Sequence, residues 1–231
     1  MRKSIRGTLL AVCVSMFTAC ATLPSEIVVD ATYVVAFKSS RLPSRFAWYV
    51  ASAEHGWFDV RDQSGWKRVE ILGRSTGVTI ESIGDEEARS DWRFGDQQAH
   101  VINIYEGEAA RVMGTQILAK AKQFPHDKNY EPFPGPNSNT FIEWMSHEVS
   151  GLWLEQYGNA VGKDYPMNGW VNFGLTTTRT GLELETPFVG VQAGLVEGVE
   201  LHLLCLTLGV GIWPPRLKLP FLPGLPWELA H

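Results

Sequence analysis

In the first half of the chain, short runs rich in β-branched and aromatic residues end at turn-forming residues. Such runs are typical of β-strands joined by tight turns. The segment Asp-Gln-Ser-Gly at 62–65 separates two of the runs and is typical of a hairpin turn. The pattern predicts antiparallel strands at 46–51, 56–60, 66–72 and 100–104.

The hydrophobic period changes in the middle of the chain. Ala110, Met113, Ile117, Ala121 and Phe124 recur at steps of three and four residues. This spacing places them on one face of a helix that packs on a sheet, and it predicts a helix over 108–124. A second amphipathic stretch follows at 142–154 and predicts another helix that begins after Phe141.

The last third of the chain is rich in Val, Leu and Gly, and 199–203 alternates apolar and polar residues. We interpret 181–211 as strands in a meander, although 195–208 also fits a buried helix. The prolines after residue 213 predict an extended tail that wraps the body. The whole pattern favours an α+β fold with an antiparallel sheet and a few helices. We expect a single domain over 44–231, preceded by a lead-in segment at 20–43.

The N-terminus resembles a bacterial export signal. Basic residues at 2, 3 and 6 precede an apolar stretch at 9–17, and Cys20 follows a small residue. This arrangement predicts a signal peptide at 1–19 and a lipid attached to Cys20. An ordinary signal peptide cut nearby is the alternative. The lipoprotein interpretation places the protein in a bacterial cell envelope, with a membrane as its partner and the periplasmic face of the outer membrane as its expected location.

Charge and cysteine content exclude several function classes. The chain has 20 basic and 25 acidic residues, and loss of the three basic residues at 2, 3 and 6 leaves 17 against 25, a net charge of −8. No basic cluster suits a phosphate backbone, so we expect no nucleic-acid partner. Disulfides are not expected either, because Cys13 leaves with the signal, Cys20 is acylated and Cys205 lies in an apolar run typical of a buried, inert thiol.

The run Pro-Gly-Pro-Asn-Ser-Asn-Thr-Phe at 134–141 stands directly before the second predicted helix. Thr140 and Glu143 fit a capping box, in which the polar residues of the run only complete the first turn of the helix. Alternatively, the same turn presents the hydroxyl of Ser138 as a nucleophile at the positive end of the helix dipole. The two interpretations separate a structural protein from an enzyme.

Seven short segments follow one another along the chain: EHGWFDV at 54–60, VEILG at 69–73, PGPNSNTF at 134–141, GKDY at 162–165, TG at 180–181, EGVEL at 197–201 and LKLP at 217–220. In this order they resemble the bacterial domain-of-unknown-function 3750 family, with a similarity that extends over about 44–220. This resemblance assigns the chain to a family, but it implies no particular reaction for the protein.

A more remote resemblance is to circularly permuted papain-like folds, which include cell-wall peptidases and lecithin:retinol acyltransferase relatives. Their helix start commonly reads Asn-Cys-x-x-Phe, and this chain has Ser138 in place of the cysteine. The resemblance implies Ser138 as nucleophile, His55 as base and Glu70 as the carboxylate that orients the imidazole. Asn137, Asn139 and Thr140 would then supply oxyanion or ligand contacts. A serine hydroxyl attacks only when its base removes the proton almost completely, whereas a cysteine is partly ionised near neutral pH. Serine in place of cysteine therefore bears directly on whether residue 138 can act as a nucleophile.

Other polar residues are weaker candidates. Lys163, Asp164 and Tyr165 are expected in a loop that borders a cleft. Glu200 and His202 point to one face of their predicted strand and are suited to pair. The six histidines show no His-x-His or His-Glu-x-x-His spacing, so no metal site and no cofactor are expected.

Two functions therefore stay open. One is an envelope lipoprotein that acts as a hydrolase or acyltransferase on an amide or ester. The other is a non-catalytic envelope lipoprotein that binds a partner or ligand, in which Ser138 and Thr140 only cap a helix. The distance between Ser138 and His55 distinguishes them.

Overall fold

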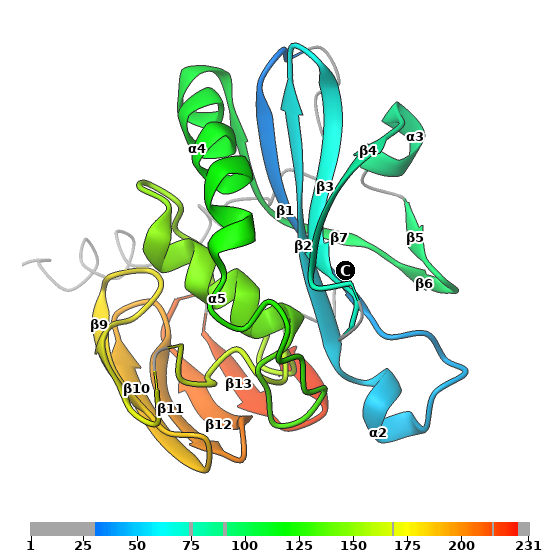
Figure 1. Ribbon diagram of the computed structural model, residues 1–231. Coiled ribbons are helices and arrows are strands. Elements are labelled where there is room, and N and C mark those ends of the chain that lie inside the picture. Colours follow the sequence, from blue (N-terminus) through cyan, green and yellow to red (C-terminus); the bar gives the residue numbers. More distant parts are fainter. Residues whose placement is uncertain (1–30, 74–75, 90–91, 168, 214, 226–231) are drawn as a thin grey trace, which may run out of the picture.

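The computed structural model describes residues 31–73, 76–89, 92–167, 169–213 and 215–225. The predicted signal peptide and Cys20 lie outside this part of the chain. Two antiparallel sheets, one from each half of the chain, are separated by the helix α5 and its flanking loops (Figure 1).

The N-terminal half forms a five-stranded antiparallel sheet, here called sheet A. Its strand order is β4-β3-β2-β1-β7. The strands are β1 Val34–Arg41, β2 Glu54–Asp62, β3 Gly65–Ile71, β4 Val78–Ile83 and β7 His100–Glu106. Asp62 pairs with Gly65 at the end of the β2–β3 hairpin, where Gly65 has a positive φ of 106°. This pairing confirms the predicted hairpin. The turn is favourable at Gly65 because glycine adopts a positive φ at no steric cost.

Two helices pack on one face of sheet A. They are α4 Gly107–Lys120, continued by the 3₁₀ turn η1 Ala121–Gln123, and α5 Ser138–Glu148. Alternate residues of β1, β2 and β3 meet the buried side of these helices, and Phe58, Ile117 and Phe141 are among the buried residues of this core. Both predicted helices are confirmed. The second begins four residues earlier than expected, at Ser138.

The opposite face of sheet A buries charges. Lys38 Nζ lies 2.8 Å from Asp59 Oδ2, and Arg68 Nε donates to Asp59 Oδ1 at 2.8 Å. Arg68 also lies over the rings of Trp57 and Trp92. Asp59 thus balances two cations in an interior where an unpaired charge is costly.

The C-terminal part forms a seven-stranded antiparallel meander, here called sheet C. Its strands follow one another in space in the order β14-β13-β12-β11-β10-β9-β8. They are β8 Asn172–Leu175, β9 Gly181–Glu185, β10 Val189–Gly194, β11 Gly198–Leu203, β12 Leu206–Gly211, β13 Arg216–Leu219 and β14 Leu222–Leu225. The meander is confirmed, and the helix alternative over 195–208 is wrong.

Sheet C is oriented against the usual pattern, with its polar face inside. Glu183, Gln192, Glu200 and Lys218 form one cross-strand row, in which Gly209 stands on β12, and all four side chains are buried. The neighbouring outward row, Phe173, Leu184, Val191, Leu201 and Leu208, is exposed. Antiparallel sheets usually bury their apolar face.

Other expectations changed. Residues 46–51, predicted as a strand, contain the short helix α2 Trp48–Ala51. The expected lead-in contributes β1, an inner strand of sheet A that pairs with β2 on one side and β7 on the other. The tail after residue 213 continues sheet C as β13 and β14. The small remaining elements are α3 Asp85–Ala88, β5 Arg93–Phe94 and β6 Gln97–Gln98.

Candidate functional site

The first turn of α5 is closed by Asn137 and Thr140. Asn137 is the N-cap, and its Oδ1 accepts hydrogen bonds from the backbone N–H groups of Asn139 at 2.9 Å and Thr140 at 3.4 Å. Thr140 Oγ1 in turn accepts from Asn137 N at 3.1 Å. The expected capping box of Thr140 and Glu143 is therefore wrong by one turn, because Asn137 supplies the cap and Thr140 occupies the third helical position.

The side-chain amides of the run hold a neighbouring loop. Asn137 Nδ2 donates to Val161 O at 3.0 Å, and Asn139 Nδ2 donates to the carbonyls of Val161 at 2.9 Å and Glu54 at 2.8 Å. Thr140 Oγ1 donates to Gly162 O at 2.6 Å. These donors satisfy backbone carbonyls, so the run ties α5 to β2 and to the loop around Gly162.

His55 and Glu70 meet as predicted. They lie on the adjacent antiparallel strands β2 and β3, and His55 Nε2 is 2.9 Å from Glu70 Oε2. Both side chains are buried, and the imidazole stacks on Trp57 and on Phe94, whose rings also contact each other. The carboxylate fixes the orientation of the imidazole.

The structure does not bring Ser138 to this pair. A β-carbon at Gly56 would lie 3.1 Å from Ile142 Cγ1, so Gly56 faces α5. Successive residues of a strand point to opposite faces. His55 therefore extends from the other face of sheet A, and Ser138 is buried at the start of α5 on the near face.

Behind α5, the inner face of sheet C contains a buried network of charged groups. Lys163 forms ion pairs with Asp164 and Glu200, the latter at 3.1 Å. His202 Nδ1 lies 2.7 Å from Glu185 Oε1, and its Nε2 lies 3.1 Å from Glu200 Oε2. The predicted pairing of Glu200 with His202 is confirmed, and Lys163 and Asp164 lie inside the network.

The network shifts the ionisation of its members. Burial disfavours the charged imidazole of His202, but Asp164, Glu185 and Glu200 outweigh burial and raise the pKa of His202 to about 9. Burial alone would raise the pKa of Glu200, but Lys163 and the other cations hold it well below its usual range. The raised pKa therefore keeps the imidazole of His202 protonated in the folded protein at neutral pH.

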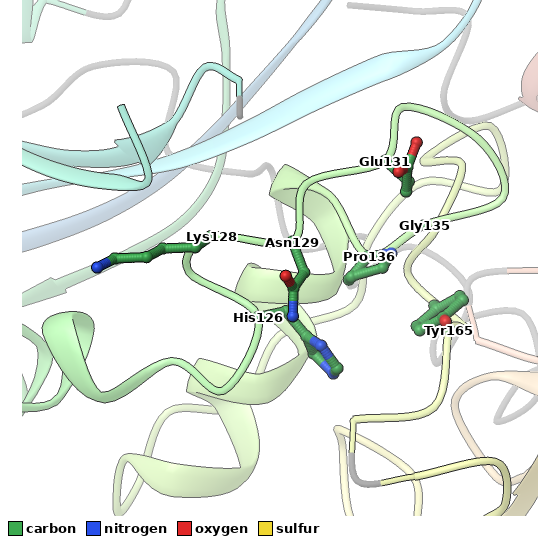
Figure 2. Close-up of a pocket in the computed structure, with 7 residues that line it drawn as sticks. All are labelled: His126, Lys128, Asn129, Glu131, Gly135, Pro136 and Tyr165. Carbon is green, nitrogen blue, oxygen red and sulfur yellow. The ribbon is translucent and has the colours of Figure 1, made fainter. Parts of the chain in front are cut away.

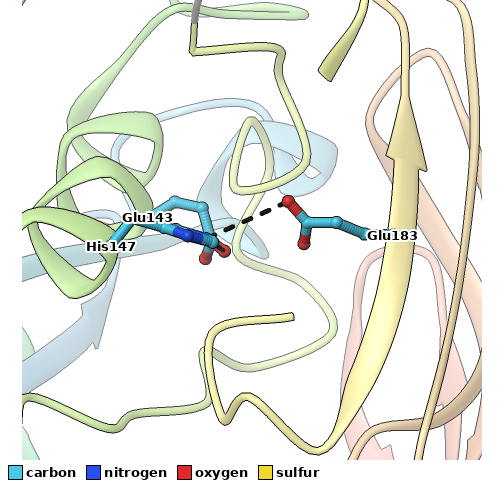
Figure 3. Close-up of side chains that lie close together, drawn as sticks. All are labelled: Glu143, His147 and Glu183. Carbon is cyan, nitrogen blue, oxygen red and sulfur yellow. Dashed lines mark ion pairs between the residues drawn. The ribbon is translucent and has the colours of Figure 1, made fainter. Parts of the chain in front are cut away.

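A second group joins α5 to sheet C (Figure 3). Glu143 and His147, four residues apart on α5, point toward Glu183 of β9. His147 Nε2 lies 3.4 Å from Glu143 Oε1 and 3.9 Å from Glu183 Oε1. Burial, and then the charge of Glu143, raise the pKa of Glu183 to about 8. Sequence reasoning missed this group. Its only local signal is the Glu143–His147 spacing.

A surface pocket of about 640 Å³ opens beside the proline-rich loop (Figure 2). Tyr165 lines it, together with residues of the segment before α5, and burial raises the pKa of Tyr165. Of the three expected cleft residues, Tyr165 alone is among those that line this pocket. The remaining lining residues are His126, Lys128, Asn129, Glu131, Gly135 and Pro136.

Cys205 is a free and buried thiol in the turn between β11 and β12, as predicted. Burial, and then Asp164, raise its pKa far above the ordinary value for a thiol. A thiol that stays protonated is a poor nucleophile, so burial disfavours a reactive role for Cys205.

The fold and these contacts define a class: a protein of antiparallel sheets and few helices, in which one capped helix lies between sheet A and the buried, charged face of sheet C. The chain belongs to the family described as "Protein of unknown function (DUF3750)", which matches residues 39–165, more than half of the 231 residues. The match covers α5 and GKDY and ends before sheet C. No curated protein and no solved structure matches the chain. Within the described residues, no helix has the length and apolar character needed to span a membrane.

Proposed function

We propose that the protein is a non-catalytic envelope lipoprotein whose sheet C rests on the acyl-chain region of a membrane. The observation that carries this proposal is the orientation of sheet C, with charges inside and aliphatic side chains outside.

The outward face is continuous. Beside the row through Leu201 runs a second row, which consists of Leu175, Leu182, Ala193, Val199, Val210 and Leu217. Seven strands about 4.8 Å apart give a face roughly 30 Å across. Exposed apolar patches of this extent mark contact sites for a protein partner or a membrane.

The lipid anchor favours the membrane as the occupant. From Cys20 to Ala31, the first described residue, the chain makes eleven steps. Even when fully extended, eleven residues reach only about 40 Å. A chain acylated at Cys20 therefore keeps its body within about one domain diameter of the bilayer, where an aliphatic face gains from contact with acyl chains.

The acidic charge of the chain limits which membrane lipids it can bind. A net charge near −8 for the lipidated chain gives no attraction to anionic headgroups. The proposed contact is therefore hydrophobic and predicts binding to zwitterionic lipid that salt does not weaken.

The catalytic alternative receives less support. It requires Ser138 to reach a base, and His55 extends from the opposite face of sheet A. The circularly permuted papain-like fold and the hydrolase or acyltransferase activity stay predictions.

Flotation with phosphatidylcholine vesicles tests the proposal. The unacylated chain 21–231 should float with the vesicles at low and high salt. Leu201→Glu places a charge at the centre of the face and should weaken binding at least tenfold. Leu72→Glu is the matched control, because Leu72 is 52% exposed at the end of β3 and Leu201 is 50% exposed. It should bind like the wild type.

Two results would overturn the proposal. One is a wild-type chain that stays with the soluble fraction. The other is a stable dimer in light scattering that Leu201→Glu dissociates, which would identify a second copy of the chain as the occupant.

A further inference from the structure

We propose that Glu143, His147 and Glu183 form a binding site for a divalent metal ion, with Zn²⁺ as the best-matched ion. This site does not depend on membrane contact, so the two proposals can fail separately.

The first argument is the distance between the donor atoms. His147 Nε2 lies 3.4 Å from Glu143 Oε1 and 3.9 Å from Glu183 Oε1, and it has no hydrogen-bond partner among the described residues. These distances are longer than those of N–H···O hydrogen bonds. In a zinc tetrahedron with bonds of about 2.0–2.1 Å, donor atoms lie about 3.3 Å apart. The three donors all lie within 4.8 Å of one another, so each pair needs a contraction of at most about 1.5 Å to reach the tetrahedral spacing.

The second argument is the support around the carboxylates. Asn172 Nδ2 donates to Glu183 Oε1 at 2.7 Å, and Gln156 Nε2 donates to Glu143 Oε2 at 3.1 Å. Each carboxylate is thus oriented by an amide from a different segment. Such contacts are the usual means by which metal ligands are held in position.

Gln156 supplies an independent observation. Its side chain is only 4% exposed and lies against Glu143, yet its Oε1 has no hydrogen-bond partner among the described residues. A buried amide oxygen without a partner is costly. A water bound to the ion at the position left open by three protein ligands would be a suitable donor to Gln156.

The charge balance favours an ion here over the neighbouring cluster. Asp164, Glu185 and His202 also form a group with metal-ligand spacing, but the ammonium of Lys163 already pairs with Asp164. In the proposed site, the carboxylates of Glu143 and Glu183 face each other across an imidazole. A divalent cation relieves the repulsion of two carboxylates brought together in a partly dry site.

Zn²⁺ accepts both imidazole nitrogen and carboxylate oxygen, and a site with three protein ligands and an open fourth position is the arrangement of catalytic zinc sites. Because Glu143 and His147 belong to α5 and Glu183 to β9, the ion would link the helix to sheet C. Bound metal would therefore stabilise the attachment of sheet C to the family-matched part of the chain.

Calorimetric titration of the chelator-treated mature chain with Zn²⁺ tests the site. We expect one ion per chain, a dissociation constant in the micromolar range or below, and a higher Tm with Zn²⁺. His147→Gln and Glu183→Gln should each weaken binding at least tenfold. Glu148→Gln is the matched control on the same helix, since Glu148 is exposed and pairs with Lys120. It should bind like the wild type.

Co²⁺ provides a second readout, because a tetrahedral site with this ligand set gives intense visible absorption that His147→Gln should abolish. Circular dichroism establishes that each variant is folded. If Glu183→Gln does not fold, the test rests on the zinc affinity of His147→Gln. The proposal is overturned if the wild type shows no saturable one-to-one binding. It is also overturned if His202→Gln loses the ion while His147→Gln retains it, because the neighbouring cluster would then be the site.

Discussion

Asn137 and Thr140 cap each other across the first turn of α5. The side-chain oxygen of each accepts a hydrogen bond from the backbone N–H of the other. Their remaining donors hold the carbonyls of Val161 and Gly162. The side chains of Asn137 and Thr140 thus both close the first turn of α5 and attach it to the loop around Gly162.

Asn137→Ala should destabilise the protein by about 1–2 kcal/mol, because an N-cap and its buried contacts are lost. Thr140→Ala should cost about 1 kcal/mol for the reciprocal bond. Urea unfolding measures both. Thr115→Ala on the exposed side of α4 is the control and should change stability by less than about 0.5 kcal/mol. Equal effects of Asn137→Ala and Thr115→Ala would contradict the capping role.

The position of His55 predicts that Ser138 is not an activated nucleophile. A fluorophosphonate probe should not label the purified chain at Ser138, because a serine hydroxyl needs a base within hydrogen-bond reach. Mass spectrometry of the treated protein, with Ser138→Ala beside it, measures this. Labelling that disappears in Ser138→Ala would restore the catalytic hypothesis.

Asp59→Ala should cost about 3–5 kcal/mol, because it leaves Lys38 and Arg68 as buried charges without their carboxylate. Asp62→Ala, three residues along the same strand, removes a partly exposed pair with Lys67 and two hydrogen bonds from Ser64. It should cost no more than about 1 kcal/mol. Guanidinium unfolding of the two variants compares them. Similar losses would mean that the buried pair is not the dominant charge interaction of sheet A.

The thermal stability of the chain should fall as pH rises through about 9. The folded-state pKa of His202 is about 9 against an ordinary value of 6.5, because Asp164, Glu185 and Glu200 surround it while Lys163 opposes them. A raised pKa contributes stability that is complete below pH 6.5 and is lost as pH approaches and passes 9. Tm measured with chelator from pH 6 to 10 follows the loss. His202→Gln should flatten the part of the curve above about pH 8, because Glu183, with a pKa of about 8, still contributes a slope below it. An unchanged curve above pH 8 would refute the assignment.

Cys20→Ser should leave the protein unprocessed or release a soluble periplasmic form, because acyl chains supply the membrane anchor. Mass spectrometry and membrane fractionation of cells that express each form measure this. A mutant with the mass and the membrane fraction of the wild type would exclude the lipoprotein assignment.

Several features of the fold could be predicted from the sequence because they depend on nearby residues. The turn at Asp62–Gly65, the three- and four-residue spacing through Ala110 and Ile117, and the alternation at 199–203 each have a local cause. The antiparallel neighbours His55 and Glu70 also followed from two short strands and one turn. The four-residue helix α2 did not, because its residues Trp48, Tyr49 and Val50 are of types enriched in strands.

What only the tertiary structure decided is which side of each element is inside. An alternating strand such as β11 is equally regular with Glu200 and His202 inside or outside, and the usual pattern buries Val199 and Leu201 instead. The cations that reverse the choice, Lys163 and Lys218, come from a distant loop and another strand, and the sequence carries no mark of their pairing with Glu200. Burial of a charge depends on its partner, and partners far apart in the chain meet only in the folded protein.

The same dependence on tertiary packing explains the outcome for two candidate sites, the predicted pair of Ser138 with His55 and the unpredicted pair of His147 with Glu183. The sequence by itself determined that a polar turn starts α5 and that an imidazole and a carboxylate share sheet A. The tertiary structure decided that Ser138 and His55 lie on opposite faces and that Glu183 approaches His147. Period and spacing are properties of the local backbone, whereas the distance between two remote side chains depends on how the elements pack.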